Sequence, residues 1–240
     1  LLETRGPQPL VHPHSRHIHI FLPKAIDSRA IGPHNEHCSE MTSARRERLK
    51  HELREEILEA ARDLFVKNGY ASVNMRAIAQ KVGCSPGTLY LYFKDKDAIL
   101  GAICQETFEK LDRHMEAIAN DTGDPLGRLR RAGRLYVQFG LNHPDHYFLT
   151  FAVVGFSGFN PEDVPLTGIR SFDCLRRNVG ACIEQGQLRI TDVEEVAQSL
   201  WASIHGLVML FIGKPCFPFI ERNRLIDAVM DIAIEGIRKR

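Results

Sequence analysis

The 240-residue chain lacks the sequence signs of several protein classes. Its six cysteines include no C-x-x-C pair and no metal-ligand spacing, which favours reduced thiols over a disulfide framework or a structural metal site. No apolar run looks long enough to span a bilayer, and no basic segment precedes an apolar core at the start. We therefore expect cytoplasmic localisation and no membrane partner. No segment alternates convincingly with period two, so we expect no sheet.

An excess of charge and the signatures of catalysis are missing as well. The 31 Lys and Arg residues balance 30 Asp and Glu residues, so any affinity for nucleic acid must come from a local patch. There is no nucleophile elbow, phosphate loop, H-E-x-x-H motif or paired-carboxylate arrangement. Ser203 and His205 are too close in sequence to form a convincing catalytic dyad, because they lie on different faces of one helix. We expect no cofactor, no metal site and no catalytic residue.

Short helices with clear stop and start residues fill the stretch from Ile57 to Leu100. Apolar residues at helical spacing indicate the first helix, which Gly69 ends because glycine adopts a left-handed conformation without a side-chain clash. Asn74 can cap the next helix by accepting a hydrogen bond from a free backbone N–H. That second helix is two turns long and ends at Gly83.

A third helix follows after a very short turn. Ser85 offers an N-cap, and Pro86 stands at the first helical position, where its missing N–H costs nothing. The helix is expected to reach about Tyr92. Two short helices joined by so tight a turn form the unit that places its second helix in the major groove of DNA. The alternative is a three-helix domain of another purpose.

The segment MRAIAQKVGCSPGTLYLYFKDKDAIL closely resembles the DNA-binding segment of TetR-type transcriptional regulators. The resemblance covers about Arg54 to Ile103: a helix ending in a glycine turn, then S-x-G-T-L-Y-x-Y-F, then K-x-K. It implies an all-α fold with an N-terminal three-helix helix-turn-helix DNA-binding domain, expected at 41–98. A C-terminal helical ligand-binding and dimerisation bundle would follow at 99–240. The implied partners are a double-stranded DNA operator, an unknown small-molecule effector and a second copy of the chain.

Within this motif, the type of each residue indicates whether it belongs to the apolar core or to the surface that contacts DNA. Apolar residues such as Ile78 and Leu89 are spaced to face inward, whereas the resemblance implies that Arg76 points at the DNA. The third helix carries no Arg, Lys, Asn or Gln from 85 to 93, so direct base reading is expected to be sparse. The candidate DNA-binding residues are Arg45, Arg46, Asn74, Arg76, Ser85, Pro86, Gly87, Thr88, Tyr90, Tyr92, Lys94 and Lys96.

Two interpretations stay open for the residues that precede the motif. The basic cluster around Arg45 and Arg46 is either a solvated helix end or a basic arm that reaches phosphates or the minor groove. Residues 1–40 are rich in Pro and His and lack helical periodicity, so we expect a disordered extension, with Met41 as the natural start. The alternative for its histidines, at 12, 14, 17 and 19, is metal binding.

After the motif, helical spacing and breaker residues predict helices at about 96–119, 125–141, 145–154, 166–184, 191–212 and 221–239. Phenylalanines gather in the middle of this region, as ordinary core or as the lining of an apolar pocket. The segment Trp201 to Gly206 also resembles the W-x-x-x-H-G signature of one TetR subgroup, in which the histidine either touches ligand or is a hydrogen-bonded core residue. The candidate effector-binding residues are Phe139, Phe148, Phe151, Phe172, Trp201 and His205.

The last two expected helices have wider apolar faces than one contact needs. From Leu200 onward the first of them is apolar on nearly every side, so it must be covered all round. A second subunit is the natural cover. The candidate dimer-interface residues are Leu207, Met209, Leu210, Val229 and Ile237.

These patterns together predict a sequence-specific DNA-binding transcriptional regulator. By analogy with the family, we expect a repressor that a small apolar effector releases from a near-palindromic operator. One alternative is a constitutive architectural DNA binder without an effector, which has no need of an internal cavity. An all-helical enzyme is the other alternative.

Overall fold

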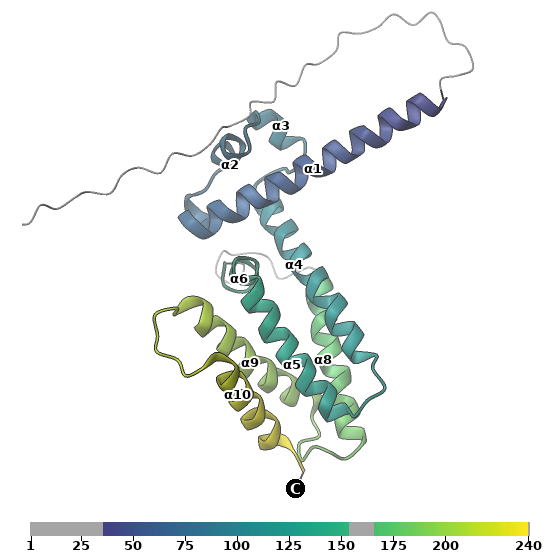
Figure 1. The fold of residues 1–240 in the computed structure, drawn as a ribbon, viewed down its shortest axis with the longest axis vertical. Helices are drawn as coiled ribbons and strands as arrows, with labels where there is room; N and C mark the ends of the chain where they lie inside the picture. Colours follow the sequence, from purple (N-terminus) through teal and green to yellow (C-terminus); the bar gives the residue numbers. More distant parts are fainter. Residues whose placement is uncertain (1–35, 154–165, 240) are drawn as a thin grey trace, which may run out of the picture. The chain divides into compact units, whose positions relative to one another are not determined.

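The computed structural model describes residues 36–153 and 166–239, with side chains from 43 to 153 and from 168 to 239. All regular elements in these ranges are helices, and one isolated antiparallel bridge joins Leu188 to Arg238, which confirms the all-α class (Figure 1). The first helix begins at Glu36, before the expected boundary at Met41. The rest of the expected N-terminal extension lies outside the described residues. The contacts reported below lie within residues 47–240, which form one unit.

The N-terminal helices are short apart from the first and the last of them. They are α1 (Glu36–Asn68), the 3-10 turn η1 (Tyr70–Ser72), α2 (Met75–Val82), α3 (Pro86–Tyr90) and α4 (Lys96–Ala119). Their side chains form a closed apolar core in which Ile57, Ile78, Leu89 and Ile99 are fully buried. Burial of this kind fixes the relative positions of α1 to α4, because each of them contributes an apolar face to one core.

The helix boundaries in this part follow from local chemistry. The side chain of Asn74 accepts a hydrogen bond from the backbone N–H of Ala77 at 3.0 Å, and that of Asp95 accepts one from Ala98 at 2.7 Å. Gly83 ends α2 with φ 81° and ψ 23°, a left-handed conformation that favours glycine. The expected turn is therefore present, although α3 ends at Tyr90 rather than at Tyr92.

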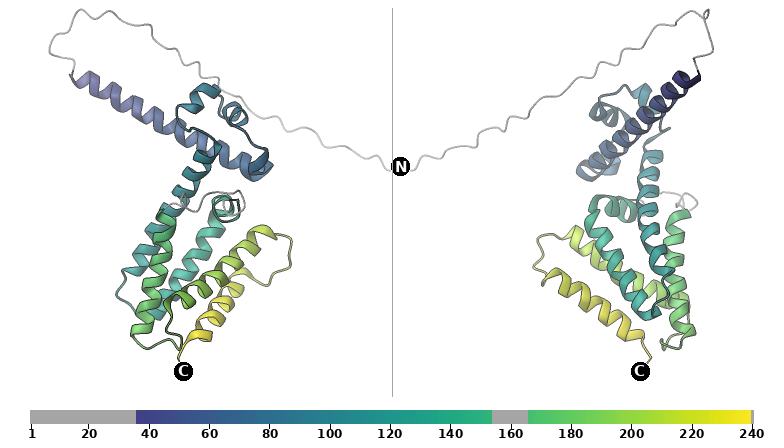
Figure 2. Two further views of the ribbon diagram at one scale, coloured as in Figure 1. Left: turned by 180° about the vertical axis from the view of Figure 1, so that it is seen from behind. Right: turned by 45° about the vertical axis from the view of Figure 1, so that its right-hand side comes forward.

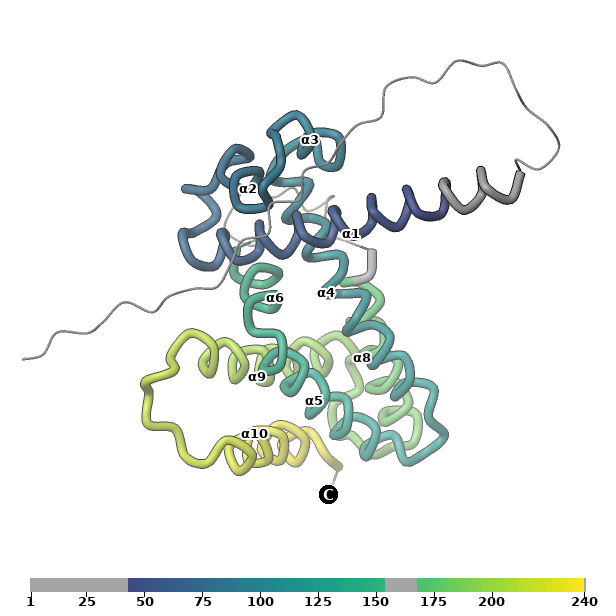
Figure 3. Tube along the Cα trace, turned by 45° about the horizontal axis from the view of Figure 1, so that its top comes forward, coloured from purple at the N-terminus to yellow at the C-terminus, as the bar shows by residue number. Residues whose placement is uncertain are grey.

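The C-terminal part is a bundle of longer helices around a second core. Its elements are α5 (Pro125–Asn142), α6 (Pro144–Phe148), the π-helical turn η2 (Leu149–Val153), α8 (Leu166–Glu184), α9 (Val193–Gly213) and α10 (Arg222–Ile237). The lower part of α4 runs beside α8, and α9 and α10 follow one another at one edge of the bundle (Figures 2 and 3). The expected helix ranges agree with these bounds to within a few residues.

Close packing of α5 against its neighbours depends on a small residue. A Cβ atom at Gly140 would collide with Val208 of α9 and with the ring of Tyr147 on α6. Ion pairs on the outside of the bundle join α5 to α10, because Arg130 pairs with Asp231 and Glu235, and Arg134 pairs with Asp227. The bundle is thus held together by apolar packing inside and by exposed ion pairs at its surface. The apolar packing contributes more to the stability of the fold than the ion pairs do.

Helix α9 corrects the expectation that no apolar run is long enough to span a bilayer. With 21 residues and a mean hydropathy of 1.5 in its most apolar window, it is long and apolar enough to cross a membrane, by length and composition alone. The core helix of a helical bundle passes the same test. Val196, Leu200 and Val208 of α9 are buried against other helices, but only 33% of the apolar window is buried, so burial in the bundle accounts for part of the apolar composition.

Candidate nucleic-acid interface and ligand cavity

The α2–turn–α3 unit presents one apolar and one exposed face. Leu89 of α3 is fully buried, whereas Arg76, Pro86, Gly87 and Tyr90 are exposed. Exposed residues at the start of α2 and along α3 are therefore supported from behind by a closed core. Such a surface can enter a groove without rearrangement of the helices.

Some of the predicted contact residues are used within the unit itself. The Ser85 hydroxyl accepts a hydrogen bond from the backbone N–H of Thr88 at 3.0 Å and lies 2.9 Å from the Thr88 hydroxyl. Asn74 caps α2 in the same way. These side chains shape the helix starts, and the exposed side chains of Arg76, Tyr90 and Lys94 are left as the direct candidates for DNA.

Lys96 has a structural position that the sequence did not indicate. Its ammonium donates hydrogen bonds to the backbone carbonyls of Tyr70 at 3.0 Å and Val73 at 3.2 Å, and lies 4.3 Å from the centre of the Tyr70 ring. Two of its three N–H donors are thereby assigned. Lys96 joins the start of α4 to the segment between α1 and α2, rather than projecting as a free phosphate clamp.

Other predicted and unpredicted residues complete this surface. Arg45 and Arg46 are exposed residues of the continuous helix α1, so their segment is helical and not an extended arm. Tyr92 is half-buried. Leu91, which the sequence analysis missed, is 83% exposed directly after α3. An exposed leucine directly after α3 can contact a thymine methyl group. The sequence offered one sign of it, because Leu91 is an apolar residue outside the buried helical stripe.

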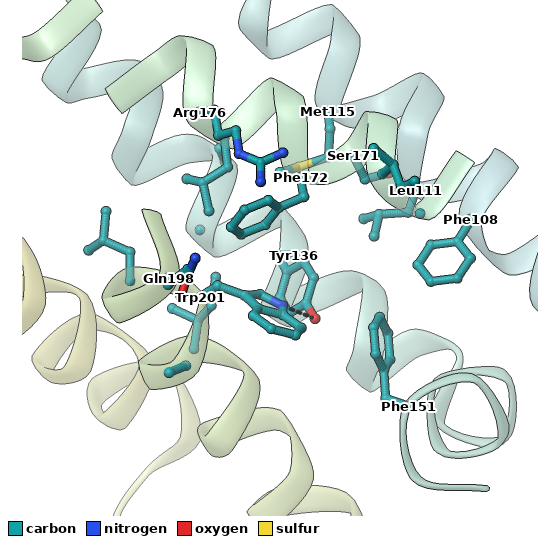
Figure 4. A pocket seen from close by; sticks show the side chains of 18 of the residues that line it. Phe108, Leu111, Met115, Tyr136, Phe151, Ser171, Phe172, Arg176, Gln198 and Trp201 are labelled. Carbon is teal, nitrogen blue, oxygen red and sulfur yellow. Dashed lines mark hydrogen bonds between the residues drawn. The ribbon is translucent and has the colours of Figure 1, made fainter. Parts of the chain in front are cut away.

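A cavity of about 830 Å³ lies inside the C-terminal bundle (Figure 4). Side chains from α4, α5, η2, α8, α9 and α10 enclose it, and most of them are apolar or aromatic. Its volume falls within the range of roughly 300–1,000 Å³ that is typical of small-molecule sites. Of the predicted effector residues, Phe151, Phe172 and Trp201 line this cavity.

Two of the predicted effector residues lie elsewhere. Phe139 is buried on α5 with its ring 5.1 Å from that of His143, and it does not line the cavity. Phe148 faces a separate, smaller depression beside Leu141 and Phe211. Both residues are apolar, as pocket residues often are. Their side chains, however, point from their helices to places outside the cavity.

Residues of α4 and α5 that the prediction left out form much of the wall. On α4 they are Phe108, Leu111 and Met115, and on α5 they are Leu129, Ala132 and Tyr136. The apolar stripe through Leu111 and Met115 was visible as helical spacing. Sequence spacing shows that such a stripe is buried, but it does not show whether it faces a neighbouring helix or an empty space.

An aromatic hydrogen-bond network forms one side of the cavity. The indole N–H of Trp201 donates to the Tyr136 hydroxyl at 3.0 Å, as Figure 4 shows, and the Tyr147 hydroxyl donates to the same oxygen at 2.9 Å. Nδ1 of His205 lies 2.7 Å from the Tyr147 hydroxyl. Burial raises the pKa of Tyr136 to about 12 and lowers the pKa of His205, so both side chains are neutral at pH 7.

His205 therefore acts on the cavity through its neighbours. It does not line the space itself, but its ring lies 5.3 Å from that of Trp201 and 5.2 Å from that of Phe151.

At another point of the wall, burial raises the pKa of the Cys104 thiol to about 11, and the neighbouring Thr150 hydroxyl opposes this rise. That hydroxyl is buried and has no hydrogen-bond partner of ordinary geometry. The wall as a whole offers apolar surface with few polar groups to spare.

A polar chain connects the bundle to α1. Nε2 of His146, on α6, lies 2.7 Å from the Arg62 guanidinium, and Nδ1 lies 3.1 Å from the Thr107 hydroxyl of α4. The Thr107 hydroxyl donates to the carbonyl of Ile103 at 2.8 Å, so it accepts from Nδ1–H, and Nε2 accepts from Arg62. Burial first, and then Arg62, lower the pKa of His146 to about 4, which agrees with a neutral ring.

The predicted dimer residues divide into two groups. Leu207 and Ile237 are buried in the core of the subunit and have little surface to offer a partner. Met209 and Val229 are half-buried, whereas Leu210 is 50% exposed. Ile232 of α10, which the prediction missed, is 75% exposed. That α9 and α10 form a dimer interface stays a prediction, and the sequence could not show which sides of them the subunit covers by itself.

The described side chains, at 43–153 and 168–239, contain no group of three or more His, Cys, Asp or Glu residues that could hold a metal ion. The cysteines described are free, with Cys104, Cys174 and Cys182 buried.

Comparisons with known proteins bear on both parts of the chain. A family model described as bacterial regulatory proteins, tetR family, matches residues 57–103. A second model, described as tetracyclin repressor-like, C-terminal domain, matches residues 129–233. The first covers the α2–α3 unit and the second covers most of the helices around the cavity. The narrower resemblance to a W-x-x-x-H-G subgroup stays a prediction.

Among curated proteins, the chain is 44% identical over 66 residues to the HTH-type transcriptional regulator UidR of Escherichia coli K12, covering 27% of this chain and 34% of that one. It is 38% identical over 78 residues to the HTH-type transcriptional repressor KstR of Mycolicibacterium smegmatis, covering 32% and 38%. The matches thus span little more than a third of each relative. Both relatives are transcriptional regulators and not enzymes.

Solved structures show that the likeness of the fold extends over most of the chain. The regulator FadR from Bacillus subtilis, in complex with stearoyl-CoA, superposes with a TM-score of 0.67 at 20% identity, covering 76% of this chain and 98% of that one. Such a likeness shows the fold alone. The two family models, matched in chain order to the DNA-binding unit and to the bundle with the cavity, show that the chain belongs to the TetR family of bacterial regulatory proteins.

Proposed function

We propose that this protein is a homodimeric transcriptional repressor that leaves a near-palindromic operator when a small apolar molecule fills the cavity of its C-terminal bundle. The observation that carries the proposal is the combination, in one chain, of an exposed helix-turn-helix face and a partly open apolar cavity of about 830 Å³. An architectural DNA binder needs the first feature but has no use for the second. The cavity therefore favours a regulated protein over that alternative.

The DNA-binding part of the proposal rests on α2 and α3. Arg76 supplies a cation for phosphate or guanine, and Pro86 and Gly87 allow the backbone at the start of α3 to approach the groove closely. Tyr90, Leu91 and the exposed Lys94 add phosphate and apolar contacts around them. Because few side chains on α3 can read base edges, the shape of the DNA contributes much of the specificity.

The dimer part of the proposal rests on the exposed sides of α9 and α10. In the second half of α9, from Ala202 onward, the exposed residues are small apart from Leu210, and they include Ser203 and Gly213. Small side chains allow two copies of this helix to approach closely, with Leu210 and the exposed Ile232 as apolar anchors. Two recognition helices in one dimer then meet successive major grooves about 34–36 Å apart.

The coupling part of the proposal rests on elements shared by the cavity and the DNA-binding unit. Phe151 of η2 lines the cavity, and η2 follows directly on α6, whose His146 contacts Arg62 of α1. Helix α4 lines the cavity with Phe108 and Met115 and begins at Lys96, beside the turn after α1. An effector that displaces η2 or tilts α4 therefore shifts the DNA-binding helices. By linkage, effector and operator then weaken each other's binding by the same factor.

The relatives support the direction of this response. KstR is a repressor by name, and the FadR structure holds stearoyl-CoA, a molecule with a long apolar chain, in a protein of the same fold. An apolar effector fits the aromatic and aliphatic lining described above. The effector itself and the operator sequence follow from experiment.

The test is a binding titration on duplex DNA taken from the region upstream of the gene for this protein and its neighbours. We expect salt-sensitive retardation of one fragment, with a footprint that has approximate two-fold symmetry. A cavity-filling variant, Ala132→Phe, should bind the same fragment more weakly if an occupied cavity disfavours DNA. Retardation that is absent for every fragment would contradict the DNA-binding role, and unchanged affinity of the folded Ala132→Phe variant would contradict the coupling.

A further inference from the structure

The charged groups at the cavity are arranged in a way that selects among effectors. Among the described residues, the lining contains one cationic side chain, Arg176 of α8, which lies beside Phe172 in Figure 4. Its guanidinium donates to Asp173 at 2.6 Å and to both carboxylate oxygens of Glu194, at 2.5 and 3.2 Å. It also lies 4.4 Å from the centre of the Phe172 ring. Arg176 is thus already neutralised and held in place.

The polar groups around Arg176 add no positive charge. The Gln198 amide donates to Glu194 at 3.1 Å, and the Ser171 hydroxyl donates to Asp112 at 3.3 Å. The carboxylates of Asp112, Asp173 and Glu194 therefore outnumber the one guanidinium. The local field at this end of the cavity disfavours an anion.

We infer that the part of the effector enclosed by the cavity is an uncharged amphiphile, such as a long-chain alcohol, and not a carboxylate. The inference deepens the proposed function and rests on it. An ionised carboxylate that entered the cavity would lose its hydration and would find no unpaired cation among the described groups, because Arg176 already holds two acidic partners. A hydroxyl group carries a much smaller desolvation cost, and it can accept a hydrogen bond from the second N–H of Gln198 or donate one to the Ser171 oxygen.

The chain carries its own reporter for this test. Trp201 is its one tryptophan and lines the cavity, so its fluorescence responds to an occupant. The probes are 1-decanol and decanoate, which share one chain length and differ in charge at about pH 8. Each is titrated into the full-length protein below its aggregation limit. We expect saturable quenching or a shift by decanol, and an affinity for decanoate that is weaker by about tenfold or more.

A double substitution reverses the selectivity if the argument is right. Asp173→Asn with Glu194→Gln frees Arg176 without removing it, and should strengthen decanoate binding by about tenfold while decanol binding stays within about twofold. The matched control is Asp231→Asn with Glu235→Gln, which makes the same change in charge around Arg130 of α5, outside the cavity. The control should leave both affinities unchanged. Circular dichroism and thermal unfolding establish that each variant is folded.

The outcomes separate this inference from the proposed function. If decanoate binds the wild-type protein as tightly as decanol or more tightly, the selectivity is wrong, while a cavity that binds small molecules still stands. If freeing Arg176 in the folded variant strengthens neither ligand, the assignment of the selectivity to the Arg176 ion pairs is wrong. If neither probe perturbs Trp201 at all, the proposed ligand-binding role of the cavity fails, and this inference fails with it.

Discussion

The two apolar cores of this chain differ in what they leave empty. Around α2 and α3 the core is small and closed, with Ile78, Leu89 and Ile99 fully buried. The core of the C-terminal bundle includes more residues and encloses a space of about 830 Å³. The first core supports a surface that acts on the outside, and a rigid interior serves that role. The second is hollow, and unfilled space is costly unless something occupies it.

This difference suggests how the two parts divide the work. A closed core resists deformation, so we expect the DNA-binding unit to move as one body. A hollow core can repack around a guest, so we expect the bundle to be the part that changes. The link between them includes α4, the polar chain from Arg62 through His146 to Thr107, and Leu149 of η2, which is fully buried in the N-terminal core. Substitutions can therefore break either part or the link, with different readouts.

The largest effect is expected from loss of the dimer. Leu210→Glu or Ile232→Glu places a carboxylate on the exposed face of α9 or α10 without entering the core of the subunit. Each variant should sediment as a monomer and lose about 100-fold or more in operator affinity, because a single half-site lacks the avidity of two. The control is Ala117→Glu, which adds the same charge to an exposed position of α4. Variants that stay dimeric and bind DNA normally would place the interface elsewhere.

A smaller effect on the DNA-binding surface alone is expected from Arg76→Ala. Loss of this exposed cation should cost about 1–3 kcal/mol of operator binding and leave thermal stability unchanged. Thr88→Val, which keeps the shape but removes the hydroxyl beside Ser85, tests a less exposed contact. Arg113→Ala on an exposed part of α4 serves as the control. Equal operator affinity for Arg76→Ala and for the control would remove Arg76 from the interface.

Lys96 separates a structural role from a DNA-binding role. Lys96→Met leaves the carbonyls of Tyr70 and Val73 without their donor and removes a cation from the Tyr70 ring. We expect a loss of roughly 1–2 kcal/mol in the free energy of unfolding, measured by urea titration. If the unfolding free energy is unchanged while the salt dependence of DNA binding becomes shallower, Lys96 is a phosphate contact after all.

The sequence predicted the DNA-binding unit well because its signals are local. Asn74, Gly83 and Ser85 act on helices within four residues of themselves, so their effects can be read in order along the chain. The hydrogen bonds of Lys96 could not be predicted in this way, because its partners at Tyr70 and Val73 belong to an earlier turn of the chain. A side chain that bonds across the fold leaves no pattern in its own neighbourhood.

The cavity was predicted less well, because a void depends on the whole packing arrangement. Of the predicted effector residues, Phe151, Phe172 and Trp201 line the cavity and Phe139 lies outside it, whereas Tyr136 lines it and was not predicted. Helical spacing gives the face on which a residue lies, but not what stands opposite that face. The burial of Leu207 and Ile237 inside the subunit was missed for the same reason, and it leaves them little surface for a partner.

The link between the two parts is expected to give the smallest effect, and it depends on pH. His146 accepts from Arg62 only as the neutral ring, and its pKa is lowered from 6.5 to about 4, first by burial and then by the charges of Arg62, Lys110 and His143. The unfolded chain therefore takes up a proton at this position before the folded chain does. Stability from this group is complete above about pH 6.5 and declines as the pH falls toward 4.

Replacement of the titrating ring isolates this contribution. His146→Gln keeps one donor and one acceptor but does not titrate, so its unfolding free energy should fall less than that of the wild-type protein between about pH 7 and pH 4.5. The difference should be about 1–2 kcal/mol, after a discount for the partial exposure of the ring. His114→Gln, an exposed position on α4, should follow the wild-type curve. Parallel curves for His146→Gln and the wild type would mean that the neutral histidine does not stabilise the contact between α1 and α6, and the coupling would then depend on α4 and on the packing of η2.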